Sequence, residues 1–158
     1  MRVLGIDPGT MTCGYGVIDF CENRFRAVAY GAVRCSRKDS FEKRLVIIFE
    51  GIDAVIAEYQ PKCAAIEEAF AGKNVQSALR IGEGRGIAIL CAARSGLPVY
   101  QYPPAVIKKA VAGNGAAHKS QVQQMVKVLT GLKELPEPED ASDALAIAIC
   151  HCHRLGAT

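Results

Sequence analysis

Apolar residues at the start of the chain fall into three short segments that predict β-strands. Arg2–Asp7 is the first and stops at Pro8-Gly9, and residues 14–20 and 26–33 follow it closely. Short apolar runs bounded by glycine, proline and polar residues are typical of strands. The three segments together predict an antiparallel meander.

From residue 41 onward the apolar period becomes that of helices. Within Phe41–Tyr59, the residues Leu45, Ile48, Ile52 and Val55 recur at helical spacing. The order predicted for the rest is strand 62–67, helix 75–94, strand 97–102, and helices 105–112, 119–129 and 140–154. Three strands followed by strands that alternate with helices predict a mixed α/β sheet covered by helices.

The length and composition indicate one folded domain. The chain has 158 residues, of which 50% are hydrophobic and 22% charged, so disorder is excluded. The longest uncharged apolar run, residues 86–93, is too short to span a bilayer, and the amino terminus lacks the apolar stretch of a signal peptide. We therefore expect a single domain over residues 1–158, a cytoplasmic location and no contact with a membrane.

The seven cysteines predict buried, reduced thiols rather than disulfides. Their number is odd, none forms a C-x-x-C pair, and several lie within apolar runs. Cys150-His151-Cys152-His153 suggests a metal site, but its spacing is wrong for zinc and no second ligand pair occurs elsewhere. We therefore expect no metal at that cluster.

Charge is distributed unevenly along the chain. Residues 71–133 hold nine Lys or Arg and one acid, Glu83, which is a net charge of +8, whereas residues 134–143 hold five acids and no base. A basic stretch of that size attracts a polyanion such as a nucleic acid. A solvated helical surface is the alternative interpretation.

Three glycines, Gly82, Gly84 and Gly86, interrupt the predicted helix 75–94. Each costs about 1 kcal/mol relative to alanine in a helix interior. A nucleotide-binding loop is excluded, because such a loop should follow a strand and open a helix. The glycines instead indicate close packing against a sheet or a second subunit.

Carboxylates occur where burial would require a partner. Asp7 ends an apolar strand, and Glu67 and Glu68 end another. An isolated buried carboxylate is costly unless a cation or donor meets it. Asp140 and Asp143 share one face at the start of an apolar helix, although either alone has an ordinary explanation as a helix cap. The alternation of the strand does not choose between Glu67 and Glu68.

If these strand ends and this helix converge, three or four carboxylates crowd one site and resist joint ionisation. Mg²⁺ resolves that conflict, because it prefers carboxylate oxygen. Two ions about 3.5–4 Å apart can bind the attacking water and the leaving oxygen of a phosphodiester. The sequence therefore favours metal-dependent hydrolysis of a nucleic acid whose backbone lies on the basic stretch.

A series of motifs resembles the RuvC family of crossover-junction endodeoxyribonucleases. The motifs are Gly5-Ile6-Asp7-Pro8-Gly9-Thr10, Gly14-Tyr15-Gly16-Val17-Ile18, Ala65-Ile66-Glu67, Phe70, Lys73-Asn74, Ser77-Ala78-Leu79, Lys119-Ser120-Gln121-Val122-Gln123 and Asp140-Ala141-Ser142-Asp143-Ala144-Leu145-Ala146-Ile147-Ala148. They occur in the family's order between residues 4 and 153, which makes the match specific.

The resemblance implies a ribonuclease H-like α/β fold with a mixed five-stranded sheet and helices on both faces. It implies Mg²⁺-dependent cleavage of Holliday junctions in recombination and repair, with two ions per site and Mn²⁺ as a substitute. Asp7, Glu67, Asp140 and Asp143 would be both catalytic residues and metal ligands, which selects Glu67 over Glu68. A homodimer packed through the glycine-bearing helix and a branch-migration complex of RuvA and RuvB are implied as partners.

The resemblance also implies contacts with junction DNA. The expected DNA-binding residues are Phe70, Lys73, Arg80, Lys108 and Lys119. Phe70 lies among small and polar residues, where a ring can stack on bases opened at the junction, although a core phenylalanine is the alternative. Lys119 opens a helix, which suits a phosphate contact.

Two other functions remain open from the sequence. Asp7-Pro8-Gly9-Thr10 resembles the phosphate loop of ATP-using phosphotransferases of the actin and sugar-kinase type, but those proteins need two such domains. The second is a non-catalytic junction-binding module in which the acids serve only as caps.

Overall fold

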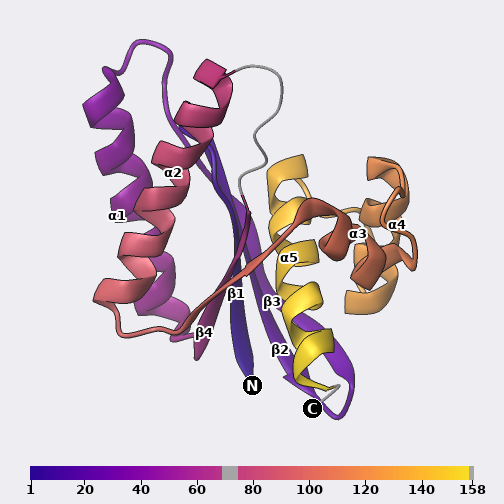
Figure 1. Cartoon of the computed structure of the whole chain (residues 1–158). Helices are drawn as coiled ribbons and strands as arrows, with labels where there is room; N and C mark the ends of the chain where they lie inside the picture. Colours follow the sequence, from indigo (N-terminus) through magenta and orange to yellow (C-terminus); the bar gives the residue numbers. More distant parts are fainter. Residues whose placement is uncertain (69–74, 157–158) are drawn as a thin grey trace.

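Helices cover both faces of a mixed five-stranded sheet in the computed structural model, which describes residues 1–68 and 75–156 (Figure 1). The strand order is β3-β2-β1-β4-β5. The strands are β1 (Arg2–Asp7), β2 (Thr12–Cys21), β3 (Arg24–Arg34), β4 (Cys63–Glu67) and β5 (Val99–Tyr102). β2 pairs antiparallel with β1 and β3, whereas β1, β4 and β5 run parallel, so the predicted fold class is confirmed.

Within the described residues, five helices lie in two layers, one on each face of the sheet. The helices are α1 (Phe41–Tyr59), α2 (Val75–Arg94), α3 (Pro104–Ala112), α4 (Lys119–Thr130) and α5 (Glu139–Leu155). Figure 1 shows α1 and α2 on one face and α3, α4 and α5 on the other. The bounds predicted for α1 and α2 from apolar spacing agree with the structure.

Both strands of the β2–β3 hairpin are longer than the apolar pattern predicts. They continue to the two-residue turn Glu22-Asn23, in which both residues have positive φ, 49° and 57°. Turns of this kind match the right-handed twist of the paired strands, so the hairpin stays paired up to the turn. The additional paired residues at the strand ends include polar ones. They pair through backbone hydrogen bonds, which a pattern of hydrophobic side chains does not predict.

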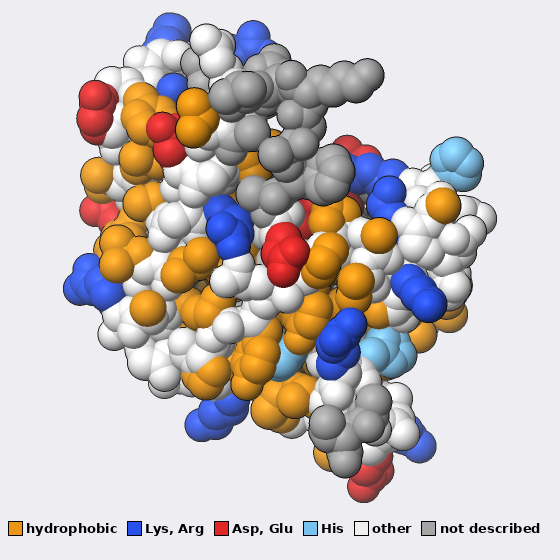
Figure 2. Space-filling model, in the orientation of Figure 1, with side chains coloured by type: hydrophobic (Ala, Val, Ile, Leu, Met, Phe, Trp, Pro, Cys, Tyr) orange, Lys and Arg blue, Asp and Glu red, His pale blue; other side chains and the backbone are white. Residues whose placement is uncertain are grey.

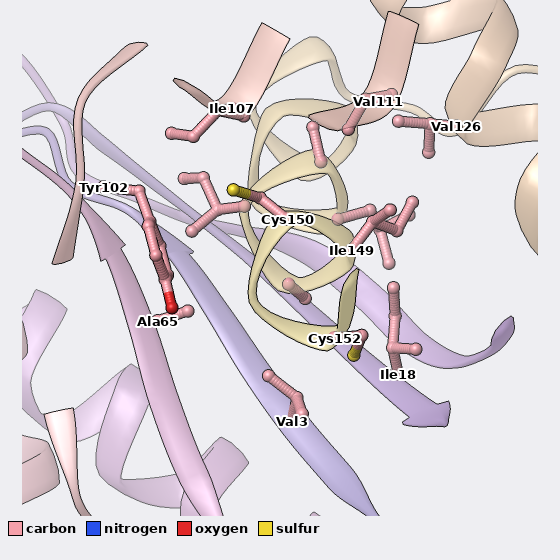
Figure 3. Close-up of a cluster of buried hydrophobic side chains, with 14 of the residues drawn as sticks. Val3, Ile18, Ala65, Tyr102, Ile107, Val111, Val126, Ile149, Cys150 and Cys152 are labelled. Carbon is pink, nitrogen blue, oxygen red and sulfur yellow. The ribbon is translucent and has the colours of Figure 1, made fainter. Parts of the chain in front are cut away.

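The two faces of the sheet have separate cores. Along β1, Leu4 and Ile6 pack with α1 and α2, whereas Val3 faces α5. Figure 3 shows the core on the α5 face, where Ile149 and Cys152 on α5 lie between the sheet and the side chains of α3 and α4. Because α5 is covered on both sides, it is apolar around most of its circumference after its first turn.

The backbone of α5 lies directly on the sheet at three glycines, Gly5, Gly14 and Gly16. A Cβ atom at Gly5 would overlap the carbonyl oxygen of Ala144, and one at Gly14 would overlap the carbonyl oxygen of Asp140. Any side chain at these positions would push the helix away from β1 and β2. The glycines therefore set the distance between α5 and the sheet.

The glycines within α2 have two different surroundings. A Cβ atom at Gly84 would lie 3.1 Å from the backbone of Gly9, in the turn between β1 and β2. At Gly82 and Gly86 it would meet nothing within 4 Å. Within the chain, the predicted close packing is thus confirmed at Gly84, against a turn rather than a strand.

The cysteines are free thiols, as predicted, and five of them are buried. Cys21 is exposed and Cys35 is half-buried, so the prediction of burial does not hold for every cysteine.

His151 is buried, and its Nδ1 lies 2.7 Å from the Tyr102 hydroxyl. In the described part of the chain, no group of His, Cys, Asp and Glu is arranged to hold a metal, and no helix is long and apolar enough to cross a membrane.

We predict that Gly5→Ala lowers the free energy of unfolding by at least about 2 kcal/mol, because the new methyl group overlaps the α5 backbone. Gly156→Ala is the matched control, since its Cβ atom would meet mainly the movable side chains of Asn23 and Phe20 at the other end of α5. Urea denaturation followed by circular dichroism measures both variants. Equal stability of the two would contradict the close-packing argument.

Candidate active site

Two of the predicted carboxylates lie side by side at the carboxyl ends of parallel strands. Asp7 ends β1 and Glu67 ends β4, and the preceding pair Ile6 and Ile66 is in register. By strand alternation both side chains share the face of Gly5 and Ala65, which is the face that α5 covers. Glu68 lies on the alternate position and is exposed.

The first turn of α5 brings Asp140 and Asp143 to the same edge. The backbone of Asp140 lies on Gly14, which is the β2 partner of Asp7. Asp140 and Asp143 are three residues apart, so their side chains point the same way from the helix. Acids separated by most of the chain thus meet at one end of the sheet.

The pKa values of these acids reflect both burial and crowding. Burial, followed by the charges of Asp143, Glu67 and Asp140, raises the pKa of Asp7 from 3.8 to about 7. Burial and the charge of Asp143 raise the pKa of Glu67. Burial also raises the pKa of Asp143, against the opposing effect of Lys119. The site therefore carries more negative charge than its surroundings neutralise.

Lys119, the first residue of α4, partly neutralises the acids. Its Nζ lies 2.8 Å from Oδ2 of Asp143 and 3.3 Å from Oε1 of Glu139, which also accepts from the amide of Gln123 at 3.2 Å. From the sequence, Lys119 was predicted to contact DNA, and Glu139 was not predicted as a site residue. The signal was present, because Glu139 and Asp143 are four residues apart and therefore share a helix face.

A cavity of about 250 Å³ opens beside the carboxylates, between α3, α4 and α5. Its charged lining is Glu67, Lys108, Lys119 and Asp143, and its apolar lining includes Ile107. The structure therefore brings the predicted DNA contacts Lys108 and Lys119 together with two of the predicted metal ligands. Phe70 and Lys73 lie outside the described residues, as does the side chain of Arg80.

The chemistry of the carboxylate set suits a hard divalent cation. Four acids at one sheet edge, with the pKa of Asp7 raised to about 7, supply oxygen ligands and unneutralised charge. Within residues 1–68 and 75–156, no three of these side chains are arranged to bind one metal ion, and Asp143 is in an ion pair with Lys119. The carboxylates thus fit Mg²⁺ in chemical type and in charge, but they lie farther apart than the ligands of one bound ion.

Comparison with known proteins identifies one family over nearly the whole chain. The family model described as "RuvC: Crossover junction endodeoxyribonuclease RuvC" matches residues 3–151. The crossover junction endodeoxyribonuclease RuvC of Heliobacterium modesticaldum is 52% identical over 155 residues, 98% of this chain and 96% of that protein. The protein of the same name from Caldanaerobacter subterraneus subsp. tengcongensis is 51% identical over 97% of this chain and 93% of its own length.

Solved structures show the same similarity in three dimensions. The structure of T. thermophilus RuvC in complex with Holliday junction substrate superposes with a TM-score of 0.91 at 35% identity, covering 99% of this chain and 96% of that one. The yeast mitochondrial Holliday junction resolvase Ydc2 superposes with a TM-score of 0.62 at 14% identity, over 95% and 78% of the two chains. The second similarity supports the ribonuclease H-like fold alone.

We predict that Asp7→Asn stabilises the metal-free protein at pH 8. Because folding raises the pKa of Asp7 from 3.8 to about 7, the wild type loses stability as the pH rises through that window. A shift of about three units corresponds to at most about 4 kcal/mol, which the asparagine avoids. Urea denaturation in EDTA at pH 8 and near pH 4 measures the gain, which should shrink at the lower pH.

Asp19→Asn is the control of opposite sign. Its carboxylate lies 2.8 Å from Arg2, which holds the pKa of Asp19 below its usual value, so this substitution should lower stability at pH 8. Equal stability of Asp7→Asn and the wild type at both pH values would contradict the crowding of charge at the sheet edge.

Proposed function

Since this chain belongs to the RuvC family of crossover junction endodeoxyribonucleases, we propose that Asp7, Glu67, Asp140 and Asp143 are the catalytic centre with which it resolves Holliday junctions. One observation carries this assignment: the four acids come from β1, β4 and α5 to one edge of the sheet, where burial, followed by the charges of the other three, raises the pKa of Asp7 to about 7. Residues that served only as helix caps or strand ends would not share one charged site.

The four carboxylates would hold Mg²⁺, two ions per site, with Mn²⁺ as a substitute. Nucleases of this family are metal-dependent. Bound ions would supply electrophilic stabilisation of the phosphoryl oxygens during hydrolysis. The four carboxylates would hold these ions beside the reacting phosphodiester, and a bound cation would offset their mutual repulsion. The negative charge of the carboxylates therefore destabilises the metal-free fold and also favours binding of a divalent cation.

Lys108 and Lys119 would place the DNA backbone over the carboxylates. Both line the cavity beside Glu67 and Asp143, so a phosphate there lies next to the acids. A cation at Asp143 would compete with the 2.8 Å ion pair of Lys119, whose ammonium would then be available to a phosphate. Phe70, Lys73 and Arg80 complete the proposed DNA contacts, with Phe70 stacking on opened bases.

A homodimer would supply two equivalent sites for symmetric cuts in strands of like polarity. The proposed contact surface is the outer side of α2, where Leu79 and Leu90 are 63% and 49% exposed. Gly82 and Gly86 lie between them without obstruction around their Cβ positions, which allows another backbone to approach. Figure 2 shows hydrophobic side chains gathered over α1 and α2 on this side of the molecule.

The wider context is proposed from the family and the fold. Residues 1–158 would form one ribonuclease H-like nuclease domain, since both cores share a single sheet. The free thiols suit a cytoplasmic enzyme of DNA recombination and repair. Four-way junction DNA is the substrate, and a branch-migration complex of RuvA and RuvB is the partner.

The two alternative functions have less support. Family membership over residues 3–151 does not favour an ATP-using phosphotransferase. A non-catalytic binding module would not need the buried, mutually repelling acids of the sheet edge.

We predict that Glu67→Gln abolishes cleavage of a synthetic four-way junction in Mg²⁺ while leaving junction binding within about threefold, because this acid holds metal rather than DNA. Glu68→Gln is the matched control, since its side chain occupies the alternate strand position and is exposed. Nicking assays with Mg²⁺ or EDTA and gel shifts measure both properties. Full cleavage by Glu67→Gln would refute the proposed site.

We predict that Lys119→Ala weakens junction binding regardless of sequence and makes the salt dependence shallower by about one unit in log–log slope. Lys62→Ala, which removes an exposed lysine before the start of β4 at the opposite end of the sheet, is the control. Fluorescence anisotropy over a range of salt concentrations gives both slopes. An unchanged slope for Lys119→Ala would remove this lysine from the phosphate contacts.

A further inference from the structure

Arg44 lies near the catalytic edge, on the face of the sheet opposite to Lys108 and Lys119. It is in the first turns of α1, and its guanidinium donates through Nη1 to Sδ of Met11 at 2.7 Å. Met11 belongs to the turn between β1 and β2 and also accepts a backbone hydrogen bond from Cys35. Figure 1 shows that α1 begins at the end of the sheet where β1 and β4 end.

The guanidinium of Arg44 has an incomplete set of partners. Its Nε is buried without a hydrogen-bond acceptor, and the thioether of Met11 is a weak one. In the part of the chain that the structure describes, no carboxylate lies within ion-pair distance of it. The side chain is instead held over the ring of Phe41, 5.7 Å from the ring centroid. A half-buried cation with unused donors favours an anionic ligand.

A cavity of about 320 Å³ adjoins Arg44, between the first turns of α1 and α2. It is lined by Phe41, Arg44, Gln76, Leu79 and Glu83. Glu83 is exposed and forms no ion pair with Arg44 among the described residues. Asp39 and Glu42 act on Arg44 through their charges without an ion pair, and Asp39 is paired with Lys43 at 2.8 Å. The space is open to an anionic group that approaches from outside.

The distance along the chain relates Arg44 to the carboxylates. Met11 follows Asp7 by four residues, which span at most about 14 Å when extended. Successive nucleotides of one strand rise about 3.4 Å along a duplex, so this span corresponds to about four nucleotides. A DNA arm that leaves Asp7 in the direction of Met11 would therefore meet Arg44 within about four nucleotides of the cleaved bond.

We propose that Arg44 binds a backbone phosphate of the junction arm that leaves the catalytic edge past the first turns of α1, beside the α2 surface assigned to the dimer. This inference rests on the proposed function. The planar guanidinium suits the phosphate oxygens in a bidentate contact. The carboxylates then lie between cations on both faces of the sheet, with Lys108 and Lys119 on one side and Arg44 on the other.

The test compares two arginines that stack on phenylalanines of α1. Arg44→Met keeps an apolar stem over Phe41 and removes the charge, and Arg94→Met does the same at the far end of α2, where Arg94 lies 5.1 Å over Phe49. We expect Arg44→Met to raise the Kd for a synthetic four-way junction about tenfold and to lower the salt slope by about one, whereas Arg94→Met changes neither. Arg44→Lys should retain the slope. Matching Kd values and slopes for Arg44→Met and Arg94→Met would overturn the proposal.

A phosphate scan gives an answer even if Arg44→Met folds poorly. Junctions that carry one neutral methylphosphonate at successive positions are bound to the wild type and to Arg44→Gln, which keeps a polar side chain but loses the charge. We expect one position within about four nucleotides of the cut to weaken binding by the wild type and to have no further effect on Arg44→Gln. An identical pattern for both proteins would overturn the assignment of Arg44.

The same experiments separate this inference from the proposed function. If the wild type binds and cuts the junction in Mg²⁺ while Arg44→Met behaves like Arg94→Met, only the role of Arg44 fails. If the wild type neither binds nor cuts the junction, the proposed function itself fails and the inference with it.

Discussion

The close seating of α5 on the sheet is the constraint on which the rest of the molecule depends. Gly5 and Gly14 leave no side chain between strand and helix, so the backbone at Asp140 and Ala144 lies directly on β1 and β2. That contact sets the distance between α5 and the strand that carries Asp7. It also allows Ile149 and its neighbours on α5 to pack in the core. The acidic edge of the sheet and the stability of this face are therefore consequences of the same packing.

The carboxylates work against the stability that this packing provides. Burial and mutual repulsion raise the pKa values of Asp7, Glu67 and Asp143, which means that the folded chain holds them ionised only at a cost. The ammonium of Lys119 offsets part of that cost through its contact with Asp143. A site of this kind gains from a cation, so affinity for metal and instability without it have one physical origin.

The sequence predicted the elements well and the details of the site in part. Apolar spacing was sufficient for α1 and α2, and strand-end position was sufficient to single out Asp7. It could not separate Glu67 from Glu68, because the choice depends on which sheet face α5 covers, a tertiary property. The ion pair of Lys119 with Asp143 and the neighbourhood of Arg44 and Met11 also arise only when distant segments pack. The glycines under α5 were recognised as motif residues, but their role needed the helix above them.

The division of the acids between β1, β4 and α5 has a consequence for synthesis of the protein. A ribosome delivers Asp7 early, but the helix that bears Asp140 and Asp143 emerges only after the other strands and helices have been made. Until then the growing polypeptide lacks half of the proposed metal ligands. Incomplete translation products would therefore lack a complete proposed metal site.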